Sequence, residues 1–264
     1  MAKNFSTMTP NASSTSSPLL AWFRRVPKVE LHLHLEGAIP LPALWELMEK
    51  YGRDPEVRTF EDLERRFEYR NFAEFIQTWI WKNRFLREYE DFEFIAEAIA
   101  NDLKKQNILY AEAFYSPSTH AVRSSLQTGR ITEALRRGLA RVPGIEVSLI
   151  ADLTRDLGPR SAERTLMEIN EVRGFGVIGI GIGGTEYEYP PHLFSKVYER
   201  ARHLGFHTTA HAGEVANSES VWGAIRELRV ERIGHGTRAV EDDSLIEYLR
   251  QTRIPIEMCP ISNV

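Results

Sequence analysis

Two histidines separated by one residue lie in an apolar segment near the start of the chain, Val29-Glu30-Leu31-His32-Leu33-His34-Leu35. In an extended strand alternate side chains point to the same face, so the two imidazoles would lie about 7 Å apart along the strand and could reach a single metal ion. Burying two imidazoles without a ligand is costly. The pair therefore predicts half of a metal site.

A third histidine and a nearby carboxylate occur much later, in the segment Thr208-Thr209-Ala210-His211-Ala212-Gly213-Glu214. His32, His34 and His211 together would give three nitrogen ligands for zinc, and a catalytic zinc also needs an open position at which water becomes hydroxide near neutral pH. Glu214 follows across a turn, so it could deliver or remove protons beside the metal. The alternative for Glu214 is a carboxylate at a helix start that interacts with backbone amides.

His235 stands between two glycines, in Gly234-His235-Gly236, and has no metal-ligand spacing to a neighbouring residue. It could orient the attacking water or stabilise its charge. The flanking glycines indicate a close approach of the backbone to another group, which an ordinary core histidine would not require. The remaining histidines are expected to be structural, because they fall in loops, exposed helices or earlier in a strand: His120, His192, His203 and His207.

Strands and helices alternate after residue 106. Expected strands span residues 107–115, 144–151, 176–182, 206–211, 230–234 and 254–259, and the His-x-His segment adds a first strand. Expected helices span residues 130–141, 159–172, 190–204, 217–228 and 241–251. This alternation predicts the α/β class and a TIM (β/α)8 barrel over an open sheet. The histidines of interest would then lie at the carboxyl ends of strands, where barrels place their chemistry.

A helical insertion is expected after the first strand, over residues 40–106, where apolar residues recur with helical spacing among many charges. Phe72, Phe75, Trp79 and Phe85 recur there at spacings of three, four and six residues. We expect these aromatic side chains to pack helices against one another. The alternative is an apolar wall over a pocket.

Composition is typical of a globular domain. The 264 residues, 42% of them hydrophobic, with a formal charge of -4, suit one soluble, cytoplasmic domain with a sizeable core. The 37 acidic and 33 basic residues are interspersed, so no nucleic-acid partner is expected. No apolar run approaches the roughly 20 residues of a membrane helix. Cys259 is the only cysteine, so any metal must be held by His, Asp or Glu. Residues 1–26 are expected to be a disordered leader and residues 27–264 the barrel domain.

Two other zinc arrangements do not fit this sequence. Cytidine-type deaminases need a His-x-Glu and a Pro-Cys-x-x-Cys motif, which a single cysteine cannot supply. Binuclear barrel hydrolases usually bridge two metals through a lysine on the fourth strand, and residues 177–184 contain no lysine. A site with one zinc ion per chain follows.

Three segments resemble the main motifs of the adenosine deaminase family, in order and at suitable separations: Lys28 to Ala38, His211 to Glu214, and Arg232 to Gly236. Further short matches are Tyr110-Ala111-Glu112, Ser116-Pro117 and Cys259-Pro260-x-Ser262-Asn263. The resemblance covers residues 27–264. It implies an amidohydrolase-type barrel that removes the 6-amino group of adenosine or a related purine by hydrolysis, giving the 6-oxo product and ammonia. The ligand of such a protein is a small purine nucleoside or base.

By matching motif, the resemblance implies that the three histidines bind zinc, that Glu214 protonates purine N1 and that His235 positions the attacking hydroxide. It also places three residues at the substrate: His34, Glu36 and Gly184. Gly184 would offer a backbone amide to N3, and Glu36 stands where the family often has an Asp near the ribose 5′-hydroxyl.

The substrate within this family is less closely defined. Phe114 occupies a position where many members have Arg, and residues 181–184 depart from the commoner acidic motif. The resemblance favours adenosine, and adenine or another 6-aminopurine stays open because small changes in a pocket redirect selectivity.

Family members also supply a zinc-binding Asp and a purine-binding Asp at the end of an eighth strand, and this sequence ends at Val264, just past the seventh expected strand. We therefore expect a barrel that lacks its eighth strand and the flanking helices and has two unpaired sheet edges. Two alternatives to a deaminase remain, namely a catalytically inactive purine-binding module and an amidohydrolase acting on another C–N bond. The oligomeric state is not indicated.

Overall fold

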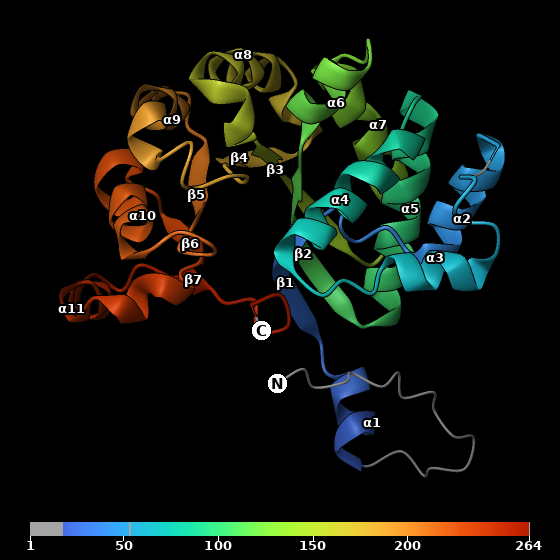
Figure 1. Cartoon of the computed structure of the whole chain (residues 1–264), viewed down its shortest axis with the longest axis horizontal. Coiled ribbons are helices and arrows are strands. Elements are labelled where there is room, and N and C mark those ends of the chain that lie inside the picture. The colour runs from blue at the N-terminus through green and yellow to red at the C-terminus, as the bar shows by residue number, and fades with distance from the viewer. Residues whose placement is uncertain (1–17, 53, 264) are drawn as a thin grey trace.

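The computed structural model describes residues 18–52 and 54–263, and its central feature is a curved sheet of seven parallel strands. The strands pair in chain order and curve into an incomplete ring, open between the first and the last strand, with the helices outside it (Figure 1). The strands are β1 (Lys28–His34), β2 (Ile108–Tyr115), β3 (Glu146–Asp152), β4 (Val177–Gly181), β5 (His207–Ala212), β6 (Arg232–His235) and β7 (Ile256–Glu257). This architecture confirms the predicted TIM-like barrel.

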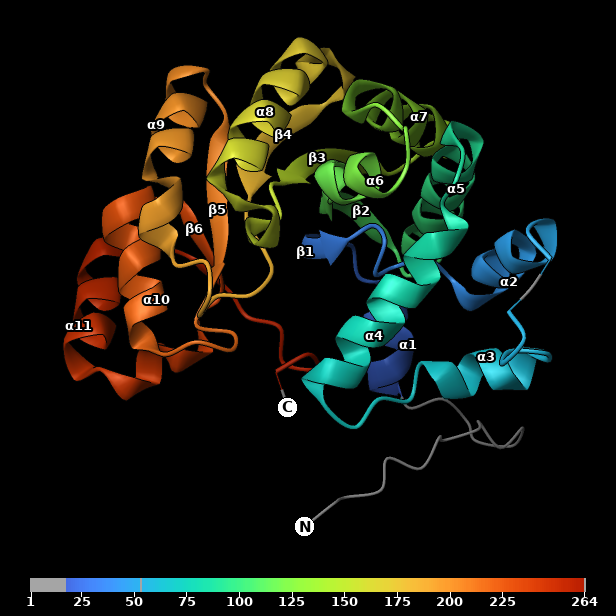
Figure 2. The same ribbon diagram turned by 45° about the horizontal axis from the view of Figure 1, so that its top comes forward.

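Helices cover the outer surface of the sheet (Figure 2). The helices that follow strands β2 to β6 are α6 (Pro117–Arg123), α7 (Thr128–Ala140), α8 (Gly158–Glu171), α9 (Ser195–His203), α10 (Ser218–Gly223) and α11 (Asp243–Thr252), with the short helices η2 (Arg155–Leu157), η3 (Arg173–Phe175), η4 (Pro191–Phe194), η5 (Ala224–Leu228) and η6 (Thr237–Glu241) between them. The insertion after β1 consists of α2 (Leu41–Lys50), α3 (Phe60–Arg66), α4 (Phe72–Lys82), η1 (Asn83–Phe85) and α5 (Tyr89–Lys105). Every helix in the described part of the chain is too short or too polar to cross a lipid bilayer.

An apolar core fills the space between the sheet and the helices. Its fully buried members include Leu35, Ile95, Ile131, Leu149 and Leu166. Parallel strands covered by helices bury apolar side chains along their length, so the polar groups gather at the strand ends. Among the described residues β1 pairs only with β2, and β7 pairs only with β6. The sheet thus has two edges, as the sequence predicts.

The last strand is shorter than expected. Residues 254–259 are predicted as a strand, but only Ile256 and Glu257 pair with β6. Pro255 has no N–H to donate to the ladder, and residues 260–263 form a turn, in which Asn263 N–H bonds the Cys259 carbonyl at 3.0 Å. The prediction of the strand was correct in place and wrong in length.

The expected leader is partly helical. Residues 1–17 lie outside the described residues, but residues 18–25 form α1 (Pro18–Arg25), where we expected disorder. Proline suits the first turn of a helix, and Arg24 and Arg25 complement the negative end of the helix dipole. Nothing in α1 is buried, and the helix is tethered to the barrel through Lys28, whose Nζ bonds the Phe23 carbonyl at 2.8 Å.

Candidate active site

Three imidazoles meet at the carboxyl end of the sheet. His32 and His34 come from β1, and His211 comes from β5. The Nε2 atom of His211 lies 3.1 Å from Nε2 of His32 and 3.0 Å from Nε2 of His34. The structure therefore brings together the three residues that the sequence predicts as metal ligands.

The spacing of the three nitrogens suits ligands of one shared cation better than a set of hydrogen bonds among the imidazoles. Zinc binds imidazole nitrogen at about 2.0–2.1 Å, so two ligands of a tetrahedral ion lie about 3.3 Å apart. The observed separations of 3.0 and 3.1 Å are close to that value. A neutral imidazole carries one N–H, so His211 Nε2 can donate to only one of its two neighbours. At least one of the two close contacts is therefore left without a well-directed hydrogen bond, and a shared cation would remove that conflict.

Burial keeps the imidazoles of His34 and His211 neutral. Burial, followed by the nearby His32, lowers the pKa of His34 to about 3. The pKa of His211 is held well below its usual value by burial and then by His32 and His34. Because a metal binds the neutral imidazole, protons would not compete for these two ligands near neutral pH.

A carboxylate behind His32 fixes the orientation of its ring. His32 Nδ1 lies 2.7 Å from Glu257 Oε2, and Glu257 is itself paired with Arg232 Nε at 2.7 Å. Nδ1 therefore carries the proton, and the lone pair of Nε2 faces the other two histidines. The sequence analysis missed Glu257. The available signal was a charged residue at the end of an otherwise apolar strand.

We expect Glu257→Gln to weaken zinc binding by roughly 10- to 100-fold, as for other groups that orient metal ligands. If the amide oxygen faces Arg232, the amide nitrogen faces His32 Nδ1 and favours the wrong tautomer. Competition between the chain and a chelator for zinc measures this effect. Glu231→Gln is the matched control, because Glu231 makes a similar 2.7 Å contact with His207 on the exposed surface. Equal zinc affinity in the two variants would contradict the orienting role.

Glu214 and His235 lie beside the three histidines. Glu214 Oε2 is 3.5 Å from His235 Nε2, and the His235 ring centroid is 4.9 Å from that of His32. Burial raises the pKa of Glu214 to about 7, and the negative charge of Glu186 adds to the shift. Burial also lowers the pKa of His235 to about 4, with His32 acting in the same direction. The pair thus offers a partly protonated carboxyl and a neutral imidazole near neutral pH.

The glycines beside His235 permit the close approach that the sequence predicts. A β-carbon at Gly234 would lie 2.8 Å from the His32 ring, and one at Gly236 would lie 2.9 Å from the Ile256 side chain. His235 itself has a φ of 65°, in the left-handed region. A non-glycine residue rarely adopts this conformation, so contacts with the surrounding residues must hold the backbone of His235 in place.

Aromatic side chains line the site on the β1 side. The His34 ring stacks on Phe114 with centroids 5.0 Å apart, and it meets Trp79 edge-on at 5.8 Å. Phe85 is buried in the core, as expected. For Trp79 the edge-on contact with His34 at the end of β1 fits the alternative of an apolar wall. The side chain of Phe72 lies outside the described residues.

Glu36 is buried two residues beyond His34, with 2% of its surface exposed. Its Oε1 accepts the Ser116 N–H at 2.9 Å and lies 3.3 Å from His120 Nε2. Burial alone would raise the pKa of Glu36, but hydrogen bonds from His120 and Ser116 hold it below its ordinary value. Among the described residues, Oε2 has no hydrogen-bond partner. His120 is therefore buried against a predicted site residue, which corrects the exposed or loop position expected for it.

Gly184 follows β4 and has a φ of 108°, which strongly favours glycine. A β-carbon there would lie 1.8 Å from Asp156 Oδ2. Asp156 also accepts the Thr185 N–H at 3.1 Å, so this exposed backbone is held against a carboxylate. The other three histidines that we expected to be structural are exposed: His192, His203 and His207.

Comparison with known proteins identifies the family of this chain. The family described as adenosine deaminase matches residues 27–264. The chain belongs to the adenosine deaminase family.

Relatives in the adenosine deaminase family extend over most of the chain. An adenine deaminase of Bordetella parapertussis is 38% identical over 245 residues, which are 92% of this chain and 77% of that protein. The crystal structure of adenine deaminase from Arthrobacter aurescens has a TM-score of 0.81 and 28% identity, and the match covers 90% of this chain and 73% of that one. An amidohydrolase from Burkhoderia ambifaria, solved with bound Zn, has a TM-score of 0.82 and 28% identity over 93% of this chain and 68% of that one.

Proposed function

We propose that this protein is a zinc-dependent purine deaminase that hydrolyses adenine to hypoxanthine and ammonia. The observation that carries the choice of adenine is the likeness to adenine deaminases over nearly the whole chain. The motif resemblance by itself favours adenosine and keeps adenine as the alternative, so the proposal reverses that order.

His32, His34 and His211 would hold one zinc ion through Nε2. When bound, zinc would make water a nucleophile at neutral pH and polarise the reacting centre. This set fits the ion because the nitrogens converge, two of the imidazoles are neutral, and Glu257 fixes the tautomer of the third.

Glu214 and His235 would move the protons of the reaction. With a pKa near 7, the Glu214 carboxyl is partly protonated at neutral pH and can donate to purine N1, which makes C6 more electrophilic. His235 is neutral and 3.5 Å from that carboxyl, so it can orient water and accept its proton as the C–O bond forms. His235 would then pass that proton to the 6-amino group, which leaves as ammonia as the C–N bond breaks. The proton of the new hydroxyl group would return to Glu214, which leaves the 6-oxo purine.

Glu36 supports the choice of a free base. Among the described residues its buried Oε2 has no hydrogen-bond partner, so an N–H donor of a ligand would satisfy it once the side chain turns toward the substrate. Adenine has an imidazole-ring N–H, whereas ribose replaces that hydrogen in adenosine. Oε1 is already occupied by Ser116 and His120, so it is not free for a ribose hydroxyl. The Gly184 amide would contact N3.

We expect the zinc-supplemented chain to deaminate adenine with a kcat/KM at least roughly 100-fold above that for adenosine, since a site built for a ligand N–H discriminates against an analogue that lacks it. The loss of purine absorbance, cross-checked by ammonia release, measures both substrates. Activity should disappear with a chelator and return with zinc.

Other outcomes identify the alternatives. A preference for adenosine would overturn the choice of adenine but keep the reaction. Purine binding without turnover by a folded, zinc-loaded chain would indicate a catalytically inactive binding module. Hydrolysis of dihydropyrimidines or lactones, with no activity on purines, would indicate an amidohydrolase for another bond.

A further inference from the structure

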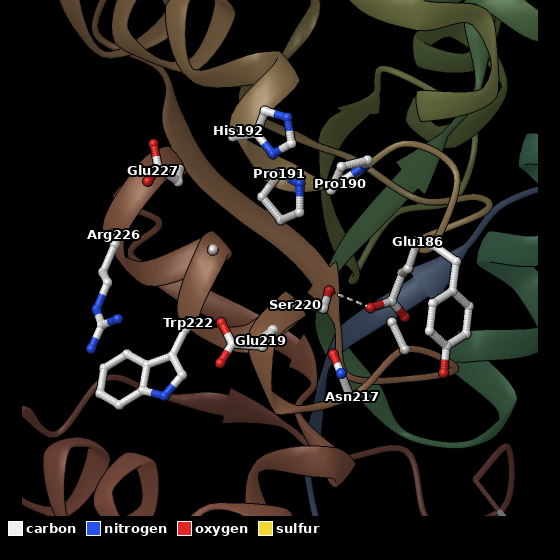
Figure 3. A pocket seen from close by; sticks show the side chains of 13 residues that line it. Glu186, Pro190, Pro191, His192, Asn217, Glu219, Ser220, Trp222, Arg226 and Glu227 are labelled. Carbon is white, nitrogen blue, oxygen red and sulfur yellow. Dashed lines mark hydrogen bonds between the residues drawn. The ribbon is translucent and has the colours of Figure 1, made fainter.

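A buried carboxylate, that of Glu186, contacts the loop of residues 213–215, which carries Glu214. Glu186, in the loop after β4, has 2% of its surface exposed. Its Oε2 accepts the Gly213 N–H at 2.8 Å, and its Oε1 accepts the N–H groups of Glu214 and Val215, each at 3.0 Å. The Ser220 hydroxyl also donates to Oε2, as the dashed line in Figure 3 shows. One carboxylate thus satisfies four donors from a single loop and the helix that follows it.

Three consecutive backbone N–H groups that point at one anion form a concave nest. Gly213 makes this geometry possible with a φ of 67°, and a β-carbon there would lie 2.6 Å from the Val221 side chain. The middle residue of the nest is Glu214. Its backbone position is therefore fixed by hydrogen bonds that all end on Glu186.

One side of this loop borders a cavity. The cavity has a volume of about 340 Å³ and is lined among others by Ala216, Asn217, Ser220 and Pro191 (Figure 3). On the other side the loop that carries Glu186 is anchored by Arg155, which donates to the carbonyls of Tyr189 at 3.1 Å and His211 at 2.7 Å. The two loops are thus joined by polar contacts at a point where apolar packing is interrupted.

We infer that Glu186 is a positioning residue for the deamination reaction: its carboxylate holds residues 213–215 so that the Glu214 carboxyl stays beside His235 and the three histidines. The inference rests on the proposed function, because it gives Glu214 the role of proton donor. Glu186 does not touch the histidines or the substrate site itself and acts through the backbone of Glu214.

The charge of Glu186 acts on the same carboxyl. Burial is the main cause of the raised pKa of Glu214, and the negative charge of Glu186 raises it further, while His32 and Arg155 act in the opposite direction. His235 faces Glu214 from β6. Removing the negative charge of Glu186 should therefore lower the pKa of Glu214 and reduce its acid form at neutral pH.

Glu186→Gln tests the inference, because the amide nitrogen is itself a donor and must face either Gly213 N–H or the amides of residues 214 and 215. We expect kcat to fall roughly 10- to 100-fold, as for a small misplacement of a catalytic group. KM should change less than about threefold, since substrate binding is not the interaction removed. Zinc content should stay at the wild-type level, and the basic limb of the pH profile of kcat should move to lower pH.

Asp91→Asn is the matched control for the loss of a buried carboxylate that binds backbone amides. Asp91 has 1% of its surface exposed and accepts the N–H groups of Arg87 at 2.8 Å and Glu88 at 2.9 Å at the start of α5. We expect this variant to lose thermal stability and to keep the wild-type kcat per folded chain. The inference would be overturned if kcat of Glu186→Gln fell only in proportion to the folded fraction. It would also be overturned if the pH profile of kcat did not shift.

Hydrogen exchange separates failure of this inference from failure of the proposed function. In Glu186→Gln the backbone amides of residues 213–215 should exchange at least about tenfold faster than in the wild type, while those of β5 before His211 stay protected. This readout does not require any turnover. Unchanged exchange at residues 213–215 would overturn the positioning role even if the chain deaminates adenine.

Discussion

Replacing Glu214 with glutamine is expected to lower kcat for adenine by roughly 100- to 10,000-fold, the usual contribution of a positioned general acid. Glutamine has nearly the same shape, but it has no acidic proton to give to purine N1. In the native chain, burial and then the charge of Glu186 raise the pKa of Glu214 to about 7, so the proton is available near neutral pH. Steady-state kinetics and zinc content of the purified variant measure the effect.

Zinc content should be unchanged in Glu214→Gln, because the Nε2 atoms of three histidines form the converging set. Glu219→Gln is a suitable control, since Glu219 lies five residues further along the chain and is exposed. We expect the control to keep its activity within about twofold, as exposed substitutions usually do. Full activity in Glu214→Gln would refute the role of Glu214, and loss of zinc together with activity would make it a ligand.

The barrel and the convergence of the histidines could be predicted because both follow from local patterns. Alternation along a strand places His32 and His34 on one face, and parallel strands of a barrel end at the same face of the molecule. His211 and His235 lie at the ends of predicted strands, so the barrel fold places them near His32 and His34. The pairing of β5 with β6, which sets Ala212 beside His235, brings this about.

The groups that support the site could not be predicted in the same way. Glu257 contacts His32 from the other edge of the sheet, across 225 residues of sequence, and no periodic pattern links them. Glu186 lies in a loop, where no alternation constrains the direction of a side chain. Arg155 is fully buried although arginine is usually exposed, because its guanidinium reaches carbonyls of β5 and of the loop after β4.

The helix of residues 18–25 and the role of Trp79 show a second limit. Composition indicates whether a segment can bury apolar surface, but α1 forms without burying any residue. Helical spacing indicates which face of α4 is apolar, but not whether that face meets the core or the site. Both questions depend on where the segment lies relative to the barrel.

Replacing His211 with alanine is expected to abolish both zinc binding and deamination. The loss of zinc affinity should exceed the roughly 10- to 100-fold expected for a group that only orients a ligand. We expect this larger loss of zinc affinity because the Nε2 atom of His211 lies within 3.1 Å of the Nε2 atoms of both His32 and His34. Zinc content after dialysis and adenine turnover with added zinc measure the two effects together.

His207→Ala is the matched control, because His207 lies on the same strand and its side chain is exposed and paired with Glu231. We expect that variant to keep its zinc and its activity. The two results together would separate the loss of a ligand from general damage to β5. If His211→Ala instead kept one zinc per chain and turned over adenine, the cation would have to sit elsewhere, and the nearest alternative donor sets are His32 with His235 and Cys259, or His235 with Glu214. We favour the set centred on His211, because the Nε2 atoms of His32 and His34 lie 3.1 and 3.0 Å from His211 Nε2, close to the ligand spacing of a tetrahedral zinc ion.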